Sequence, residues 1–193
     1  MKKKLLTAER FGHTTGDPWR WRGATGSDIE AIVALVGRNY EVDGAGVTDI
    51  NPVEGSRNLM FAVVNQMYAP KKELISVAEL TDTKEIVAFT WAQRDIRLPW
   101  SVEEMVVPKL LSVELTMSNR CRTALCVQAM LMWERWAQVC EIRSISSSTM
   151  RLDWQPLMKL HEAMDYTVRG SNAYKRMSTV KFEQSTGSII LPR

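Results

Sequence analysis

The chain has 193 residues, of which 45% are hydrophobic and 24% are charged, a balance that predicts one globular domain with a sizeable core. No run is long and apolar enough to cross a bilayer, and the basic N-terminus lacks the apolar segment of a secretory signal, so we expect an intracellular protein. The three cysteines fall in one predicted helical region and there are only two histidines, which argues against a disulfide framework and against a metal site.

The net charge of +3 is distributed unevenly along the chain. Residues 1–22 and residues 169–193 each carry a charge of +4, so the body between them carries −5. Two basic ends on an acidic body favour attachment to an acidic protein or to nucleic acid. The alternative is that the basic ends only keep the protein soluble. If the ends bind a partner, we expect contacts from Arg20, Arg22, Lys175 and Arg176.

The first elements are a short aromatic strand over 19–24 and a helix that begins near residue 28. Ser27 and Glu30 have the spacing of a capping box, and Gly37 lies near the expected end of this helix. Trp19 and Trp21 alternate with arginines in the strand, which fits either stacking on nucleic acid or packing at the edge of a sheet. We expect packing.

A second helix and a hairpin follow. Asn51 is placed to cap a helix that runs to Tyr68, with proline at its first position and Pro70 beyond its end. The β-rich runs 74–80 and 85–93 are separated by a turn-forming segment, a pattern typical of a hairpin.

The next strand is expected over 105–116, and Pro108 predicts a bulge or bend within it because proline cannot donate a ladder hydrogen bond. A long helix over 122–140 follows. Its apolar residues recur at helical spacing and form one stripe for the core: Cys126, Ala129, Met130, Trp133, Trp136, Ala137 and Cys140.

The C-terminal part predicts a strand over 143–150, a helix over 154–164 capped by Asp153, and a closing strand over 167–179 with a turn at 170–172. The element order is therefore β-α-α-β-β-β-α-β-α-β, which is an α+β fold with a mixed central sheet flanked by helices. We expect a basic extension over 1–18, one domain over 19–180 and a tail over 181–193.

The stretch 115–125 joins a strand to the long helix through a short turn. Such a junction forms an anion site, because free backbone N–H groups and the helix dipole converge there. Loops of this kind usually carry glycines, whereas this one has Cys121, Thr123 and Leu125.

Two interpretations of this junction remain open. Arg120 and Arg122 oppose the helix dipole unless an anion is present, which favours an anion site. The alternative is that Ser118 caps a buried helix and the two arginines are simply solvated.

The element order resembles that of the GCN5-related N-acetyltransferase (GNAT) superfamily, over roughly residues 19–180. The family pattern V-x-P-x-Y-R-G-x-G-x-G/A binds the pyrophosphate of acyl-CoA through backbone amides. The side chains at the glycine positions imply a degenerate loop that binds no cofactor, or acetyl-CoA weakly. The resemblance implies cofactor-binding positions at Leu115, Arg120, Cys121, Arg122, Thr123, Ala124 and Leu125.

The resemblance also implies catalytic residues. Family members often use a carboxylate on the fourth strand as general base, which points to Glu114, with Glu103 and Glu104 as alternatives. The family run L-Y-E-K-x-G-F corresponds to residues 160–166, where His161 stands at the position of the proton-donating tyrosine. The alternative for His161 is a structural helix residue.

We favour a GNAT-like domain that has lost turnover and works as a structural or interaction protein, similar to the GNAT-like internal virion proteins of T7-like bacteriophages. Its partners would be proteins reached through the basic termini, or nucleic acid, and it would be cytoplasmic or packaged in a virion. The alternative is an acyl-CoA-dependent N-acyltransferase with an unusual loop and His161 as its proton donor.

Overall fold

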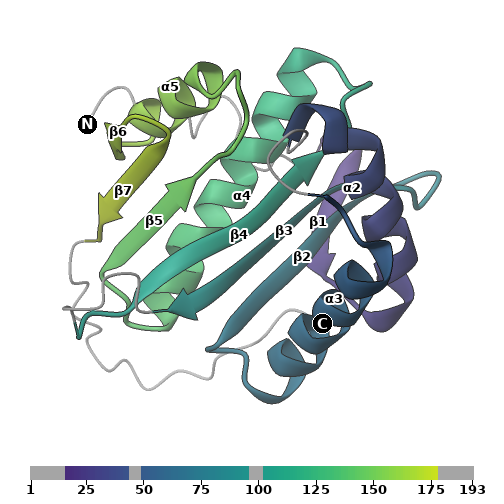
Figure 1. Cartoon of the computed structure of the whole chain (residues 1–193), viewed down its shortest axis with the longest axis horizontal. Coiled ribbons are helices and arrows are strands. Elements are labelled where there is room, and N and C mark those ends of the chain that lie inside the picture. Colours follow the sequence, from purple (N-terminus) through teal and green to yellow (C-terminus); the bar gives the residue numbers. More distant parts are fainter. Residues whose placement is uncertain (1–15, 44–48, 96–101, 178–193) are drawn as a thin grey trace.

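The structure is a computed structural model that describes residues 16–43, 49–95 and 102–177, and a mixed sheet runs through the middle of these residues (Figure 1). Across the sheet the strand order is β1-β2-β3-β4-β5-β7-β6, with β4 and β5 parallel. The strands are β1 (Trp19–Gly23), β2 (Glu73–Leu80), β3 (Ile86–Asp95), β4 (Met105–Val113), β5 (Ser144–Ser148), β6 (Thr167–Arg169) and β7 (Asn172–Arg176).

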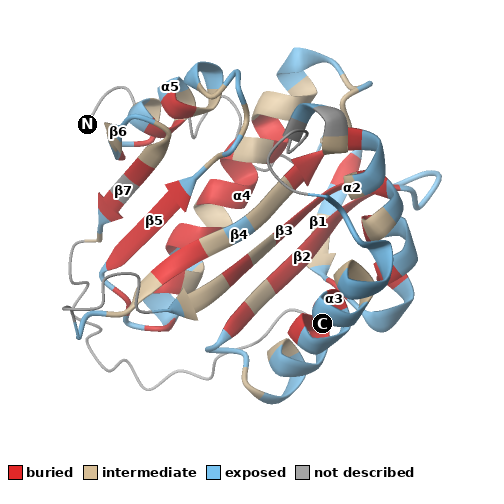
Figure 2. Cartoon of the chain, viewed as in Figure 1, coloured by how far each residue is buried: buried red, intermediate tan, exposed pale blue. Residues whose placement is uncertain are grey.

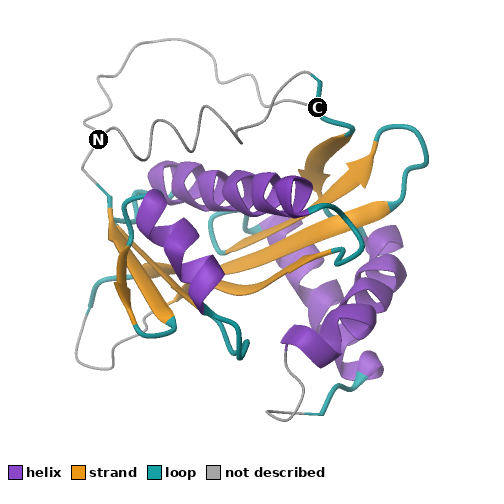
Figure 3. Cartoon of the chain, turned by 90° about the horizontal axis from the view of Figure 1, so that it is seen from above, coloured by secondary structure: helices purple, strands orange, loops and turns teal. Residues whose placement is uncertain are grey.

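The helices cover both faces of this sheet (Figure 3). They are the 3₁₀ turn η1 (Gly26–Asp28) and the α-helices α2 (Ile29–Asp43), α3 (Pro52–Tyr68), α4 (Asn119–Val139) and α5 (Gln155–Ala163). Helices α2 and α3 share a core with Ile75, Val77 and Phe89 of the sheet. Helices α4 and α5 share another with Val106 and Ile145. The predicted α+β class and element order are confirmed, and the closing strand divides into the hairpin β6–β7.

Strand β4 carries the expected bulge. Trp91 pairs with Leu110 and Ala92 pairs with Pro108, so Lys109 is the extra residue. Proline removes a ladder donor at this point, which explains why the strand bulges there. The strand ends at Val113, three residues before the predicted end.

Local caps explain where the helices begin. Asn51 caps α3 as predicted, accepting the N–H groups of Val53 and Glu54. The prediction for Ser27 is wrong. Instead the Asp28 carboxylate accepts the N–H and the hydroxyl of Thr25, because a 3₁₀ turn precedes the α-helix.

Two other expectations about helix ends are also wrong. Gly37 lies inside α2, which continues to Asp43, since a single glycine costs a helix only about 1 kcal/mol. Asp153 does not cap α5. Its carboxylate accepts hydrogen bonds from Arg151 instead, and Trp154 occupies the N-cap position without a side-chain bond.

The apolar stripe of α4 faces the sheet as predicted, and the buried residues of the helix lie on that side (Figure 2). Trp133 is buried, and its indole N–H donates to the Thr90 hydroxyl at 2.9 Å. Trp19 and Trp21 both donate to the Gln128 side-chain oxygen at 2.9 Å, which joins β1 to α4. These two indoles therefore pack at the sheet edge, as expected.

Candidate functional site

Strands β4 and β5 are paired only where they begin. The pairs are Met105 with Ser144 and Val106 with Ile145, after which the two strands diverge (Figure 1). Helix α4 crosses from the end of β4 back to the start of β5. The loop 114–118 and the first turn of α4 are the predicted anion-binding segment, and they lie at the open end of the divergent strands.

Four amides of this segment have acceptors within the segment. The hydroxyl and the carbonyl of Ser118 accept the N–H groups of Cys121 and Arg122 at 3.3 and 3.0 Å. Glu114 accepts two more backbone N–H groups. Its carboxylate accepts that of Thr116 at 3.2 Å, and its carbonyl accepts that of Met117 at 3.3 Å. An internal cap and an internal carboxylate therefore occupy donors that would otherwise face an anion.

Helix α4 begins at Asn119 rather than at the predicted residue 122. Because each N–H of an α-helix bonds to the carbonyl four residues earlier, the amides from Thr123 onward belong to the internal bonding of the helix. This holds for Thr123, Ala124 and Leu125. These three predicted positions therefore have no free backbone N–H for an anion.

The side chains of the predicted binding positions have separate environments. Leu125 is fully buried and Ala124 is buried, both in the cluster that packs β1 and β3 against α4. The Thr123 hydroxyl donates to the Asn119 carbonyl at 2.8 Å. Cys121 and Leu115 are half-buried.

The arginines remain near the surface at the start of α4. Arg120 is exposed, and Arg122 donates to the Asn119 side chain. Arg151, in the segment after β5, lowers the pKa of Asp153, and Arg122 contributes to the same shift. The Arg151 guanidinium donates to both oxygens of the Asp153 carboxylate, at 2.9 and 3.1 Å.

Glu114 follows β4 and is held by two neighbours. Its carboxylate accepts hydrogen bonds from Nη2 and Nε of Arg38, at 2.8 and 3.1 Å, and from the Thr116 hydroxyl at 3.2 Å. Burial would raise the pKa of Glu114, but the hydrogen bonds from Arg38 and Thr116 outweigh it and hold the pKa below its ordinary value. A carboxylate in this state is a weak base. Arg38 gave no signal in the sequence, since it lies 76 residues from Glu114.

His161 lies on α5 in the core. Its side chain is fully buried, and the ring of Tyr166 contacts it edge-on with the two ring centres 4.9 Å apart. Nδ1 pairs with the Leu157 carbonyl at 2.9 Å, and among the described residues Nε2 has no hydrogen-bond partner. Burial lowers the pKa of His161, and the hydrogen bond to Leu157 offsets only part of that effect. Among the described residues, no hydrogen bond joins His161 to Glu114.

Acid should destabilise the fold through His161. Because burial lowers its pKa in the folded state, the unfolded chain takes up the proton first. The free energy of unfolding is therefore unaffected by His161 above the unfolded pKa of about 6.5. As the pH falls below that pKa, it decreases by at most about 1.4 kcal/mol per pH unit. In urea titrations between pH 7 and pH 5, His161→Phe should flatten this decline, whereas Tyr166→Phe should leave it. An equal decline in both variants would place the acid sensitivity elsewhere.

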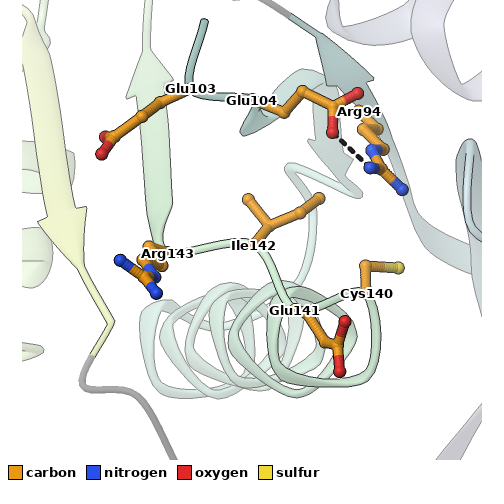
Figure 4. A pocket seen from close by; sticks show the side chains of 7 residues that line it. All are labelled: Arg94, Glu103, Glu104, Cys140, Glu141, Ile142 and Arg143. Atoms are coloured by element: carbon orange, nitrogen blue, oxygen red, sulfur yellow. Dashed lines mark ion pairs between the residues drawn. The ribbon is translucent and has the colours of Figure 1, made fainter.

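A hollow of about 190 Å³ lies at the opposite end of the β4–β5 pair (Figure 4). Glu103 and Glu104, the alternative general bases, lie here, roughly 30 Å from Glu114 at ~3.3 Å per strand residue. Glu104 pairs with Arg94, and Glu103 with Arg176 at 2.9 Å. The hollow therefore contains carboxylates that already have guanidinium partners.

The four cations expected to contact a partner are engaged within the chain. Arg22 pairs with Asp28 and Glu79 at 2.7 Å, and Arg20 pairs with Glu79 at 2.8 Å. Lys175 is buried, so it is not a surface anchor, and its ammonium donates to Glu134 at 2.7 Å. Arg176 is the one already paired with Glu103. Segments 1–15 and 178–193, which carry most of the other terminal charges, lie outside the described residues.

Two further findings concern the described residues alone. They contain no group of three or more His, Cys, Asp or Glu side chains placed to hold a metal ion. Within residues 16–43, 49–95 and 102–177, no helix is long and apolar enough to cross a membrane.

Comparison with solved structures shows the fold. No family model matches the sequence, and no curated protein sequence matches it significantly. An N-acetyltransferase from Staphylococcus aureus Mu50 superposes with a TM-score of 0.63 at 14% identity, over 83% of this chain and 98% of that one. A GNAT-family acetyltransferase from Streptococcus pneumoniae gives 0.60 at 14%, over 83% and 99%.

The PaiA N-acetyltransferase from Thermoplasma acidophilum, solved with coenzyme A, gives a TM-score of 0.58 at 12% identity, over 82% of this chain and 98% of that one. At these identities the likeness concerns architecture. The chain therefore has the GNAT fold, as its element order predicted.

Proposed function

We propose that this chain is a GNAT-fold structural or interaction protein whose acyl-CoA loop is degenerate and which performs no acyl transfer. The observation that carries the proposal is the closure of the 114–122 segment on itself. Ser118 and Glu114 occupy four amide donors of the segment, where acyl-CoA proteins of this fold present free amides to a pyrophosphate. The buried position of His161 and the ion pair of Glu114 with Arg38 add support.

The test is a melting-temperature titration with CoA and acetyl-CoA up to millimolar concentration. We expect a shift of less than about 1 °C, because a ligand at 100-fold its Kd would add about 2.7 kcal/mol and several degrees. Arg120→Glu is the matched control, since a genuine CoA shift should disappear in that variant. A shift of several degrees that Arg120→Glu abolishes would contradict the proposal.

The second candidate function is an acyl-CoA-dependent N-acyltransferase. Arg120 and Arg122 favour it, because two guanidinium groups in the first turn of a helix suit an anionic ligand. Structures of the same fold were solved as acetyltransferases, one of them with coenzyme A. In that case Glu114→Gln and His161→Ala should each reduce the rate by about 10²–10⁴-fold.

For the interaction protein we propose protein partners, as in a phage virion assembly, with nucleic acid as the alternative. The charge of the chain supports this, since residues 1–22 and 169–193 are each basic while the body is acidic. The protein would be cytoplasmic or packaged in the virion. Loss of assembly after removal of residues 2–4 and 181–193 would support the basic ends as contacts, and undiminished assembly would make them a solubility feature.

A further inference from the structure

Helix α3 is apolar on two opposite sides. Its inner side places Leu59, Ala62 and Val63 in the core shared with α2 and the sheet. Its outer side carries six large apolar side chains that each expose between 40% and 85% of their surface: Val53, Met60, Phe61, Val64, Met67 and Tyr68. A surface helix needs only one apolar face to pack on its domain. The outer face therefore requires a separate explanation.

The six outer residues form a continuous stripe. At 3.6 residues per turn, positions 53, 60, 64 and 67 lie almost in line, with 61 and 68 beside them. The charged residue within the stripe, Arg57, is paired with Glu54 one turn away at 2.6 Å. The helix carries no other charged side chain, so the stripe presents no net charge to whatever covers it.

We propose that this stripe packs against the same stripe of a second copy of the chain, forming an antiparallel α3–α3 dimer. Two identical stripes can pack together, because neither carries net charge and the side-chain ridges of one helix fit the grooves of the other along their length. An arrangement with twofold symmetry also closes, so it makes a dimer rather than a filament.

The size of the stripe is compatible with such a dimer. With six side chains that each expose on the order of 100 Å², a symmetric pair offers up to roughly 1,200 Å² for burial, which reaches the lower bound for a stable specific interface. In the antiparallel register, Phe61 and Val64 meet at the centre. Tyr68 of each copy then lies beside the Glu54–Arg57 pair of the other, where an arginine can stack on its ring.

The experiment is sedimentation equilibrium of the full chain from about 1 to 100 µM, where we expect a species of twice the 22.0 kDa monomer mass. Phe61→Glu/Met67→Glu should weaken dimerisation by about 100-fold or more, because it places four carboxylates in an apolar interface. Its melting temperature at low concentration should stay within about 2 °C of wild type, since both side chains are exposed. Asn58→Glu, on the flank of the same helix, is the control and should leave the dimer intact.

Three outcomes would overturn the proposal. The first is a wild-type monomer at every concentration, and the second is a dimer that survives Phe61→Glu/Met67→Glu. The third is a monomer that dimerises only after removal of residues 183–193, which would assign the stripe to the apolar end of the chain's own tail. The dimer is independent of the 114–122 segment, so none of these outcomes bears on CoA binding.

Discussion

Glu134→Gln should lower the free energy of unfolding by about 3–5 kcal/mol, because it leaves the Lys175 ammonium buried without its anion. Both side chains are less than 10% exposed, and Nζ lies 2.7 Å from Oε1 of Glu134. The same ammonium donates to the Met164 carbonyl at 2.7 Å and lies 5.1 Å from the centre of the Tyr166 ring. The pair therefore joins α4, the end of α5 and β7. Urea unfolding at neutral pH is the measurement.

Two controls separate the lost ion pair from a general effect of charge. Glu162→Gln removes a carboxylate from the exposed side of α5 and should change stability by less than about 0.5 kcal/mol. Glu134→Leu/Lys175→Met removes both charges and should recover most of the loss, since an apolar pair of similar volume is often as stable. A loss below about 1 kcal/mol for Glu134→Gln would mean that water reaches Lys175 in the folded protein.

Local signals in the sequence predicted the parts of the fold that depend on neighbouring residues. The capping asparagine Asn51 and the proline after it defined the start of α3, and the bulge in β4 followed from Pro108. The apolar stripe of α4 predicted the burial of Trp133. These features are encoded within a few residues of where they act, so period and cap chemistry are sufficient to find them.

Contacts between distant residues were beyond such signals. Nothing near Glu114 indicates that Arg38 holds it, and nothing near Lys175 indicates Glu134, 41 residues earlier. One usable signal was missed. Glu134 stands on the buried side of α4, next to Trp133, where a charged residue needs a buried partner.

The start of α4 shows how cap chemistry sets a helix boundary. The spacing of apolar residues placed the start near residue 122, whereas the Ser118 cap, one of the two interpretations of this junction, places it at Asn119. The cap is the stronger determinant, because its hydroxyl satisfies the Cys121 N–H directly. The earlier start places Thr123, Ala124 and Leu125 inside the helix, where their N–H groups bond within it.

Arg22→Met should cost about 2–3 kcal/mol of stability, although the sequence suggested Arg22 as a contact for a partner. Its guanidinium donates to both carboxylate oxygens of Asp28, at 2.7 and 2.8 Å, and to Glu79 at 2.7 Å. Both acidic side chains are almost fully buried, so removing Arg22 leaves them poorly compensated. The hydrogen bond from Arg22 is the main reason that the pKa values of Asp28 and Glu79 are lowered.

The matched control is Arg20→Met. Arg20 lies on the same strand and contacts the same Glu79, but its side chain is 59% exposed, so its loss should cost less than about 1 kcal/mol. Because the pKa values of Asp28 and Glu79 are lowered in the folded state, the two carboxylates stabilise the fold fully above their unfolded pKa of about 4. This stabilisation is lost as the pH falls below that value. Arg22→Met should therefore lose less stability than wild type when urea unfolding is repeated at pH 3. If Arg22→Met unfolds like wild type at pH 7 while its binding to a partner fails, Arg22 is a contact residue and the ion cluster of β1, β2 and η1 is dispensable for folding.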